Sequence, residues 1–219
     1  MSKGIKIMIT GATGFVGEGV MLSCLQHPQV TEVLMVNRRP YPLQHPKLKE
    51  LIVPAFMALD GYEAQLSGYD ACFYCAGISS VGMNEEKYTH ITYDTTLVFA
   101  NKVLSLNPEI VFNFISGSHT DSSEKGKVMW ARVKGKTENA LMRMPFKAQY
   151  NFRPGGMKAV EGQRNTKALY KALVSIIGFL FPKAVVTLAE LANAMVNAAT
   201  KGYSKQVLEI KDIKALAKI

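Results

Sequence analysis

One short segment near the N-terminus, Ile5–Gly17, constrains the fold of this chain more than any other feature. It reads IKIMITGATGFVG, an apolar run followed by Gly11, Gly14 and Gly17 in the spacing G-x-x-G-x-x-G, and apolar residues at helical spacing come next. The order strand, glycine loop, helix lets the backbone turn tightly and brings the positive end of the helix dipole next to a bound phosphate. We therefore expect a phosphate-binding loop, and a structural turn without a ligand is the alternative.

Strand-like and helix-like segments alternate along most of the chain, which is typical of a parallel sheet with crossover helices. Several of the apolar runs are continuous, as in strands that are buried on both faces. The expected strands are Ile5–Thr10, Glu32–Asn37, Glu50–Pro54, Ala71–Cys75, Ile110–Ile115, Gln149–Phe152 and Gln206–Ile210. The expected helices are Gly14–Gln26, a turn at Tyr62–Leu66, Lys87–Leu106, Val128–Met142, Lys167–Phe181 and Leu188–Thr200.

The C-terminal third is less regular. Thr187 followed by Glu190 predicts a capping box at the start of the last of these helices. Because the strand-helix alternation loosens after Gly155, we expect one domain over residues 1–219, to which residues from about 156 to 219 contribute a small C-terminal lobe.

Composition narrows the class of protein. Of the formal net charge of +9, residues 111–219 carry 18 Lys/Arg against 7 Asp/Glu, but these lysines lack interleaved aromatics, so solvated helix faces explain them better than nucleic-acid binding. No apolar stretch reaches the length of a membrane span. Three cysteines indicate a reducing compartment, and we expect a cytoplasmic protein. Cys72 and Cys75 form a C-x-x-C inside an apolar run, which favours buried strand residues over a redox or zinc site.

The second expected strand ends at Asn37, and Arg38 and Arg39 follow it. In dinucleotide-binding folds an acidic residue at this place binds the adenosine ribose, whereas arginine accommodates a 2′-phosphate. Because guanidinium groups pair strongly with phosphate, the sequence predicts a preference for NADP(H) over NAD(H). A solvated basic loop is the alternative.

With these motifs the sequence resembles the short-chain dehydrogenase/reductases, in particular extended and atypical members related to NAD-dependent epimerase/dehydratases. The carriers of the resemblance are TGATGFVG, the Asn37-Arg38-Arg39 strand end, the strand closing in Cys75-Ala76-Gly77, and FRPG at residues 152–155. The small reductases of the Tat-interacting-protein type are the most similar branch. The resemblance spans nearly the full length and implies a Rossmann-type, doubly wound parallel sheet with a small C-terminal substrate lobe.

Two positions depart from the family pattern. An aspartate that contacts adenine is replaced by Ala55, with Phe56 beside it, so apolar contact would hold the adenine. The family's catalytic Tyr-x-x-x-Lys is matched at Lys134, but Trp130 stands at the place of the tyrosine. Indole donates a hydrogen bond without ionising, so the usual proton transfer is missing. Trp130 could still bind a substrate oxygen or stack on it, and a packing role in the core is the alternative.

Other residues could supply the missing proton. The resemblance makes Ser116 the serine that polarises the substrate, with Ser118 as the fallback, and His119 has a suitable pKa for acid-base work. Three tyrosines near the fourth expected strand are further candidates, although packing roles are favoured for them: Tyr74, Tyr88 and Tyr93. The histidines have no partner at metal-ligand spacing, so we expect no metal site.

The resemblance thus implies an oxidoreductase, or an epimerase-like enzyme, that acts on a carbonyl or a secondary alcohol. Its expected catalytic residues are Ser116, Trp130 and Lys134. A non-catalytic NADP(H)-binding sensor or scaffold protein is the rival interpretation, and both a monomer and a homodimer are compatible with the family. The residues expected to bind the cofactor are Gly11, Thr13, Gly14, Phe15, Val16, Gly17, Asn37, Arg38, Arg39, Ala55, Phe56, Cys75, Ala76, Gly77, Lys134, Arg153, Pro154 and Gly155.

Overall fold

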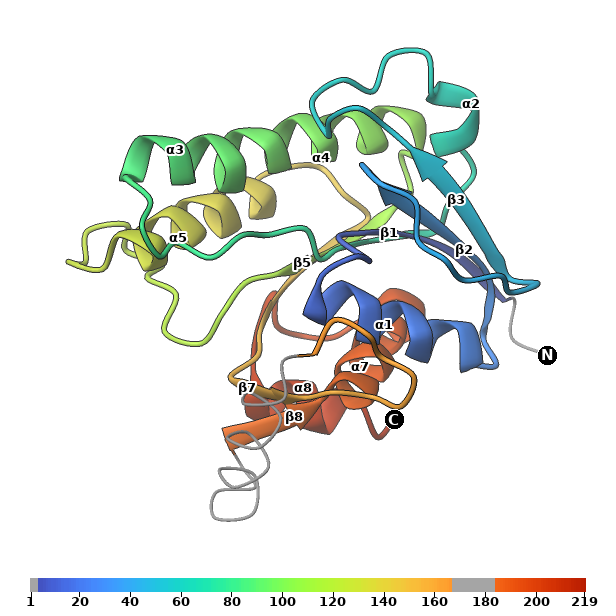
Figure 1. The fold of residues 1–219 in the computed structure, drawn as a ribbon. Coiled ribbons are helices and arrows are strands. Elements are labelled where there is room, and N and C mark those ends of the chain that lie inside the picture. Colours follow the sequence, from blue (N-terminus) through green and yellow to red (C-terminus); the bar gives the residue numbers. More distant parts are fainter. Residues whose placement is uncertain (1–3, 167–183) are drawn as a thin grey trace.

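A computed structural model of the protein describes residues 4–166 and 184–219 (Figure 1). Its main feature is a sheet of seven strands in the order β3-β2-β1-β4-β5-β6-β9, and each neighbouring pair is parallel. This order turns around between β1 and β4, as in a doubly wound Rossmann-type sheet. The strands are β1 (Ile5–Thr10), β2 (Val30–Asn37), β3 (Leu48–Ile52), β4 (Ala71–Tyr74), β5 (Val111–Ile115), β6 (Ala148–Arg153) and β9 (Val207–Glu209).

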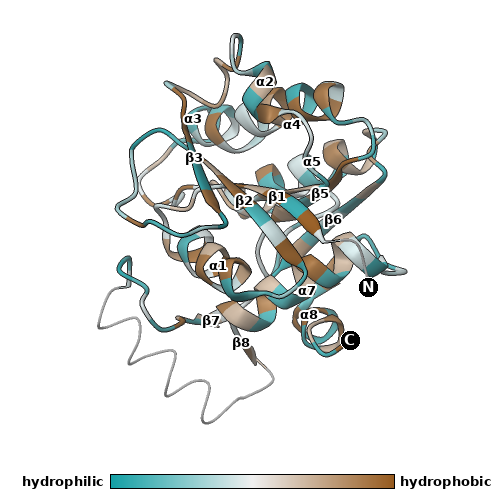
Figure 2. Cartoon of the chain, turned by 90° about the vertical axis from the view of Figure 1, so that its right-hand side faces the viewer, coloured by the Kyte–Doolittle hydropathy of each residue, from teal (hydrophilic) through white to brown (hydrophobic). Residues whose placement is uncertain are grey.

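Helices cover both faces of this sheet, as Figure 1 shows. The described helices are α1 (Phe15–Gln26), α2 (Glu63–Leu66), α3 (Glu85–Thr89), a π-helical turn (His90–Asp94), α4 (Thr95–Leu106), α5 (Met129–Met142), α7 (Leu188–Lys201) and α8 (Ile210–Leu216). In Figure 2 hydrophobic and hydrophilic stretches alternate along the helices, as expected when one side faces a sheet and the other faces solvent.

Two buried apolar clusters lie on opposite faces of the sheet. Alternate residues of β1 divide between them: Ile7 packs with α1, α7 and α8, whereas Met8 packs with α4 and the end of α5. This alternation follows from the two-residue period of a strand. The sequence prediction of an α/β fold with a Rossmann-type parallel sheet is therefore confirmed.

The boundaries of most elements agree with the sequence to within two residues, and the capping box of Thr187 and Glu190 is present. The helix predicted over Lys87–Leu106 differs, because a π-helical turn divides it into α3 and α4. The last predicted strand, Gln206–Ile210, was also too long: Glu209 and Asp212 form a second capping box, so α8 begins at Ile210. The helix predicted over Lys167–Phe181 lies outside the described residues.

The described C-terminal residues contribute to two places. β7 (Gly156–Lys158) and β8 (Val185–Thr187) form a separate parallel pair that the sequence did not indicate. In contrast, α7 packs directly on α1, where a Cβ on Gly19 would lie 2.4 Å from Leu188 Cδ1, and β9 completes the main sheet. Among the helices that the structure describes, none has the length and apolar character needed to cross a membrane.

Candidate active site

A cavity of about 840 Å³ opens at the carboxyl ends of β1, β2, β4 and β5, where the strand order turns around. This edge is where ligands bind in open parallel sheets. Most of the predicted site residues line it. Its described lining residues are Gly11, Thr13, Gly14, Phe15, Val16, Gly17, Asn37, Arg38, Arg39, Pro54, Phe56, Cys75, Ala76, Gly77, Ile78, Ser79, Tyr88, Thr92, Phe114, Ile115, Ser116, Lys134 and Met157.

The glycine loop is built so that α1 approaches β1 and β4 closely. Gly11 has a φ of +70°, and a Cβ there would lie 2.7 Å from the backbone nitrogen of Ala76. A Cβ on Gly17 would lie 2.2 Å from the carbonyl oxygen of Gly11. Gly14 is the N-cap of α1, and no side chain caps that N-terminus. The start of α1 therefore faces the cavity without a side-chain cap, and the buried Glu18 is the acidic residue of its first turn.

One end of the cavity is formed by residues that follow β2 and β3. The Arg38 guanidinium carbon lies 6.0 Å from the centroid of the Phe56 ring. Asn37 is only 2 % exposed, and its side-chain nitrogen has no hydrogen-bond partner among the described residues. A buried amide nitrogen without a hydrogen-bond partner is unusual, and it indicates that a bound ligand accepts this hydrogen bond. Ala55, predicted at this end, does not line the cavity; it forms an isolated bridge with Ala58.

Ser116 and Lys134 meet at the other end of the cavity. The Ser116 hydroxyl lies 3.0 Å from the Thr120 hydroxyl, and the Lys134 ammonium donates to the carbonyl oxygen of Ile115 at 3.4 Å. The same ammonium lies 5.9 Å from the centre of the Phe114 ring. Burial lowers the pKa of Lys134 to about 8, although the nearby Glu138 carboxylate opposes the shift. Lys134 is thus more easily deprotonated than an exposed lysine.

Trp130 is placed beside this end and does not line the cavity among the described residues. It lies one turn before Lys134 on α5, and its ring is 3.7 Å from the position that a Cβ on Gly117 would take. The indole therefore packs against the loop that follows Ser116.

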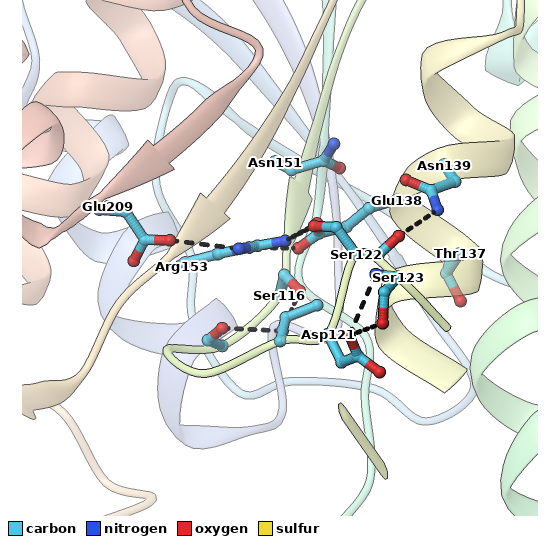
Figure 3. Close-up of polar contacts among 12 residues, drawn as sticks. Ser116, Asp121, Ser122, Ser123, Thr137, Glu138, Asn139, Asn151, Arg153 and Glu209 are labelled. Carbon is cyan, nitrogen blue, oxygen red and sulfur yellow. Dashed lines mark hydrogen bonds and ion pairs between the residues drawn. The ribbon is translucent and has the colours of Figure 1, made fainter. Parts of the chain in front are cut away.

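Arg153 is turned away from the cavity into a buried ion pair (Figure 3). It donates to both Glu138 oxygens, at 2.9 and 2.5 Å, and also to Ser122 and Glu209. Glu138 is fully buried, and Arg153 is 8 % exposed. A buried carboxylate needs a charged partner, and the ion pair with Glu138 therefore orients Arg153 toward α5.

The two residues after Arg153 are also outside the cavity lining. The Pro154 carbonyl accepts from the backbone N–H of Ser118, and Gly155 lies close to Ile210. Pro154 therefore supports the loop after β5 and Gly155 lies against the start of α8, while Met157 of β7 reaches the cavity.

Sequence reasoning missed several lining residues, among them Thr92, and gave Tyr88 a packing role. These two residues are four apart, a spacing that places them on one face of a helix, and that signal was available. Ile78, Ser79 and Met157 come from loops and a short strand, which carry no such pattern. Of the other candidates, Tyr74 packs among the aromatic rings of the core, Tyr93 contacts Lys136, and His119 does not line the cavity. Within the described parts of the chain no cluster of side chains could hold a metal ion.

The model of the NAD dependent epimerase/dehydratase family matches residues 7–141, which is more than half of the chain. The protein therefore belongs to this family. No curated protein sequence matches it.

Solved structures with the same fold include three enzymes. UDP-N-acetylglucosamine 4-epimerase of Methanobrevibacter ruminantium, in complex with UDP-N-acetylmuramic acid, has a TM-score of 0.67 at 15% identity over 94% of this chain and 76% of its own. The Bordetella bronchiseptica enzyme WbmF in complex with NAD+ has a TM-score of 0.66 at 16% identity over 99% and 77%. ADP-L-glycero-D-manno-heptose-6-epimerase of Helicobacter pylori has a TM-score of 0.66 at 17% identity over 99% and 82%.

Proposed function

We propose that this protein binds NADP(H), in preference to NAD(H), and exchanges hydride with a carbonyl compound or the corresponding secondary alcohol. The observation that carries the proposal is one continuous cavity. It joins the glycine loop, the Arg38-Arg39 pair and the Ser116-Lys134 pair at the strand-order reversal of the sheet. The Bordetella enzyme of the same fold binds NAD+, which supports a dinucleotide here.

The cavity fits a dinucleotide in several independent ways. The uncapped N-terminus of α1 suits a pyrophosphate, because it offers a positive dipole end behind three glycines. The unpartnered side-chain nitrogen of Asn37 can donate to a ribose oxygen at the β2 end. Phe56 and Pro54 supply apolar contact for an adenine.

Two arginines favour a 2′-phosphate. Arg38 and Arg39 both line the cavity, next to Asn37, and no Asp or Glu is among the described residues that line it. An acidic residue would repel a 2′-phosphate, whereas guanidinium groups bind it through charge-assisted hydrogen bonds.

The opposite end has the groups that would act on the substrate. The dinucleotide would supply the hydride. Ser116 would donate a hydrogen bond to the substrate oxygen, and Lys134 would bind the neighbouring ribose with its ammonium. Met157 lines this cavity from β7, so we also propose that the C-terminal region contributes to the substrate site.

Trp130 favours a second candidate, a sensor or scaffold protein that binds NADP(H) without turnover. Indole cannot take the role of the ionisable tyrosine, and loss of a general acid typically lowers a rate by about 10²- to 10⁴-fold. The two candidates share the binding site and differ only in turnover.

A screen of aldehydes and ketones with NADPH separates them. The enzyme hypothesis predicts NADPH oxidation with at least one carbonyl class and its loss in Lys134→Ala. The sensor hypothesis predicts tight NADPH binding, no oxidation across the screen, and a gain of activity in Trp130→Tyr. Absence of NADPH binding to the folded protein would contradict both.

A further inference from the structure

The proposed reduction requires a proton for the substrate oxygen, and Trp130 of α5 cannot supply it because indole does not ionise. The titratable side chains among the described lining residues are Arg38, Arg39, Cys75, Tyr88 and Lys134. The arginines lie at the β2 end, and burial raises the pKa of the Cys75 thiol. Tyr88 and Lys134 are therefore the remaining candidates among these residues.

We propose that the Tyr88 phenol, carried by α3, is the proton donor and acceptor of this site in place of the tyrosine missing from α5. This inference rests on the proposed hydride-transfer function. Tyr88 of α3 would take the acid-base role that Trp130 of α5 cannot perform.

Tyr88 is held firmly at the cavity. It is 2 % exposed, and the helix that carries it is capped by Asn84, whose side chain accepts from the Lys87 backbone N–H at 2.9 Å. Tyr88 itself donates its backbone N–H to the Asn84 carbonyl. A buried aromatic ring on a capped helix start has few alternative positions, as a proton donor requires.

An ion pair fixes α3 to the helix that carries Lys134. Arg132 of α5 donates to Glu85 of α3 at 2.6 Å and to the Gly126 carbonyl at 2.6 Å. Arg132 lies between Trp130 and Lys134 in the sequence, so the contact places α3 beside the part of α5 that carries Lys134. In the family, one helix carries both the proton-donating tyrosine and the lysine. Here α3 would carry the proton donor and α5 the lysine.

Thr92, a neighbour of Tyr88, provides a second sign of a ligand at this place. Its side chain lines the cavity and is 7 % exposed, and its hydroxyl has no hydrogen-bond partner among the described residues. It belongs to the π-helical turn that directly follows α3, and such turns are frequent at functional sites. A buried hydroxyl without a partner at the edge of a cavity points to a polar ligand atom.

The surroundings keep Tyr88 protonated before reaction. Burial raises the pKa of its phenol, and the Thr92 hydroxyl, near it but outside hydrogen-bond geometry, opposes the shift. In carbonyl reduction, the substrate carbon gains the hydride and the π-electron pair of the C=O bond moves onto oxygen. The O–H bond of Tyr88 breaks and its proton goes to that oxygen. The phenolate then regains a proton from the Lys134 ammonium, which water replenishes.

The first test compares Tyr88→Phe with Tyr93→Phe, a matched tyrosine on the following turn that does not line the cavity. With a carbonyl substrate from the screen, we expect Tyr88→Phe to lower kcat/KM by about 10²- to 10⁴-fold. The dissociation constant of NADPH, followed by fluorescence, should change less than about threefold, and Tyr93→Phe should leave both unchanged. Full activity in a folded Tyr88→Phe would overturn the assignment and leave the proposed function standing.

The second test needs no turnover. The ultraviolet absorbance of tyrosinate is titrated with and without NADP+, and the Tyr88→Phe curve is subtracted from that of the unmodified protein. Because the oxidised nicotinamide ring is cationic, the pKa of a phenol beside it should fall on binding. Bound NADP+ that leaves the Tyr88 phenol pKa unchanged would overturn the assignment. Failure of NADP+ and NADPH to bind at all would instead contradict the proposed function.

Discussion

Gly17 sits where α1 crosses the loop after β1, and a Cβ there would lie 2.2 Å from the Gly11 carbonyl oxygen. Since that neighbour is backbone, it cannot yield cheaply. We expect Gly17→Ala to lower the free energy of unfolding by about 1–3 kcal/mol. Gly77→Ala is the matched control, because nothing lies within 4 Å of its Cβ position. Urea unfolding of both variants checks this, and equal stability would show that α1 can move away from β1.

The protonation state of the Lys134 side chain should change with folding and with NADPH binding. Burial lowers its pKa from 10.5 to about 8, so between these values the unfolded chain keeps a proton that the folded chain has lost. Its contribution to stability therefore rises with pH through this window. A bound dinucleotide phosphate or ribose would favour the ammonium form. We expect proton uptake when NADPH binds at about pH 9, measured by calorimetry in buffers of different ionisation enthalpy.

Lys134→Arg is the control for this measurement, because arginine stays charged at that pH. The variant should bind NADPH without the proton uptake. Uptake that persists in Lys134→Arg would mean that another group titrates.

Some residues of the site could be predicted from the sequence because their roles are local. The glycines follow from a strand, a loop and a helix that are contiguous in the chain, and Asn37 and Arg38 from the end of one strand. Arg153 could not be placed, because its orientation depends on Glu138, a carboxylate on another element that must be paired when buried. Tyr88 and Thr92 needed the fold to show that the face they share is turned to the cavity.

At the level of elements, the Arg153-Glu138 pair joins β6 to α5 and, through Ser122, to the loop after β5. We expect Arg153→Met to destabilise the protein by about 3–5 kcal/mol, because Glu138 would stay buried without a partner. The double variant with Glu138→Met should recover much of that loss. Lys49→Met, which removes an exposed pair with Glu32, should cost about 1 kcal/mol or less. Thermal unfolding measures the stability of all three variants. A double variant that is no more stable than Arg153→Met would contradict the pairing.

The start of α7 offers a smaller test. Thr187 and Glu190 cap it reciprocally, with 3.0 Å from the Glu190 backbone nitrogen to the Thr187 hydroxyl and 2.7 Å from the Thr187 nitrogen to the Glu190 carboxylate. Thr187→Ala should lower stability by about 1 kcal/mol, whereas Thr187→Ser should retain most of it. A loss of the same size in both variants would point to lost packing of the threonine methyl group.

Sequence patterns were most reliable for elements with a strong period. The continuous apolar runs became the central strands, and the capping box located α7. The π-helical turn was not predictable from helical periodicity, because it keeps helical backbone angles while shifting the register by one residue. The β7-β8 pair was missed because it joins short segments from distant parts of the chain, and no local signal specifies such a pairing.

In the whole molecule, the topology of the sheet determines which residues line the cavity. The strand order turns around between β1 and β4, and the residues that carry charge or hydroxyl groups follow the carboxyl ends of the strands beside that point. The topology thus brings together residues that are far apart in the sequence, such as Arg38 and Lys134. Neither Arg38 nor Lys134 alone indicates a dinucleotide, but their presence in one cavity does.

Calorimetric titration of NADPH and NADH into the unmodified protein and into the Arg38→Ala/Arg39→Ala double variant measures whether the two arginines select the 2′-phosphate. Charge-assisted hydrogen bonds to a 2′-phosphate are worth about 1.5–3 kcal/mol, so we predict that NADPH binds roughly 10- to 100-fold more tightly than NADH. The double variant should lose that difference and bind both weakly. Equal affinities in the unmodified protein, or an NADPH preference that survives without the two arginines, would contradict the account.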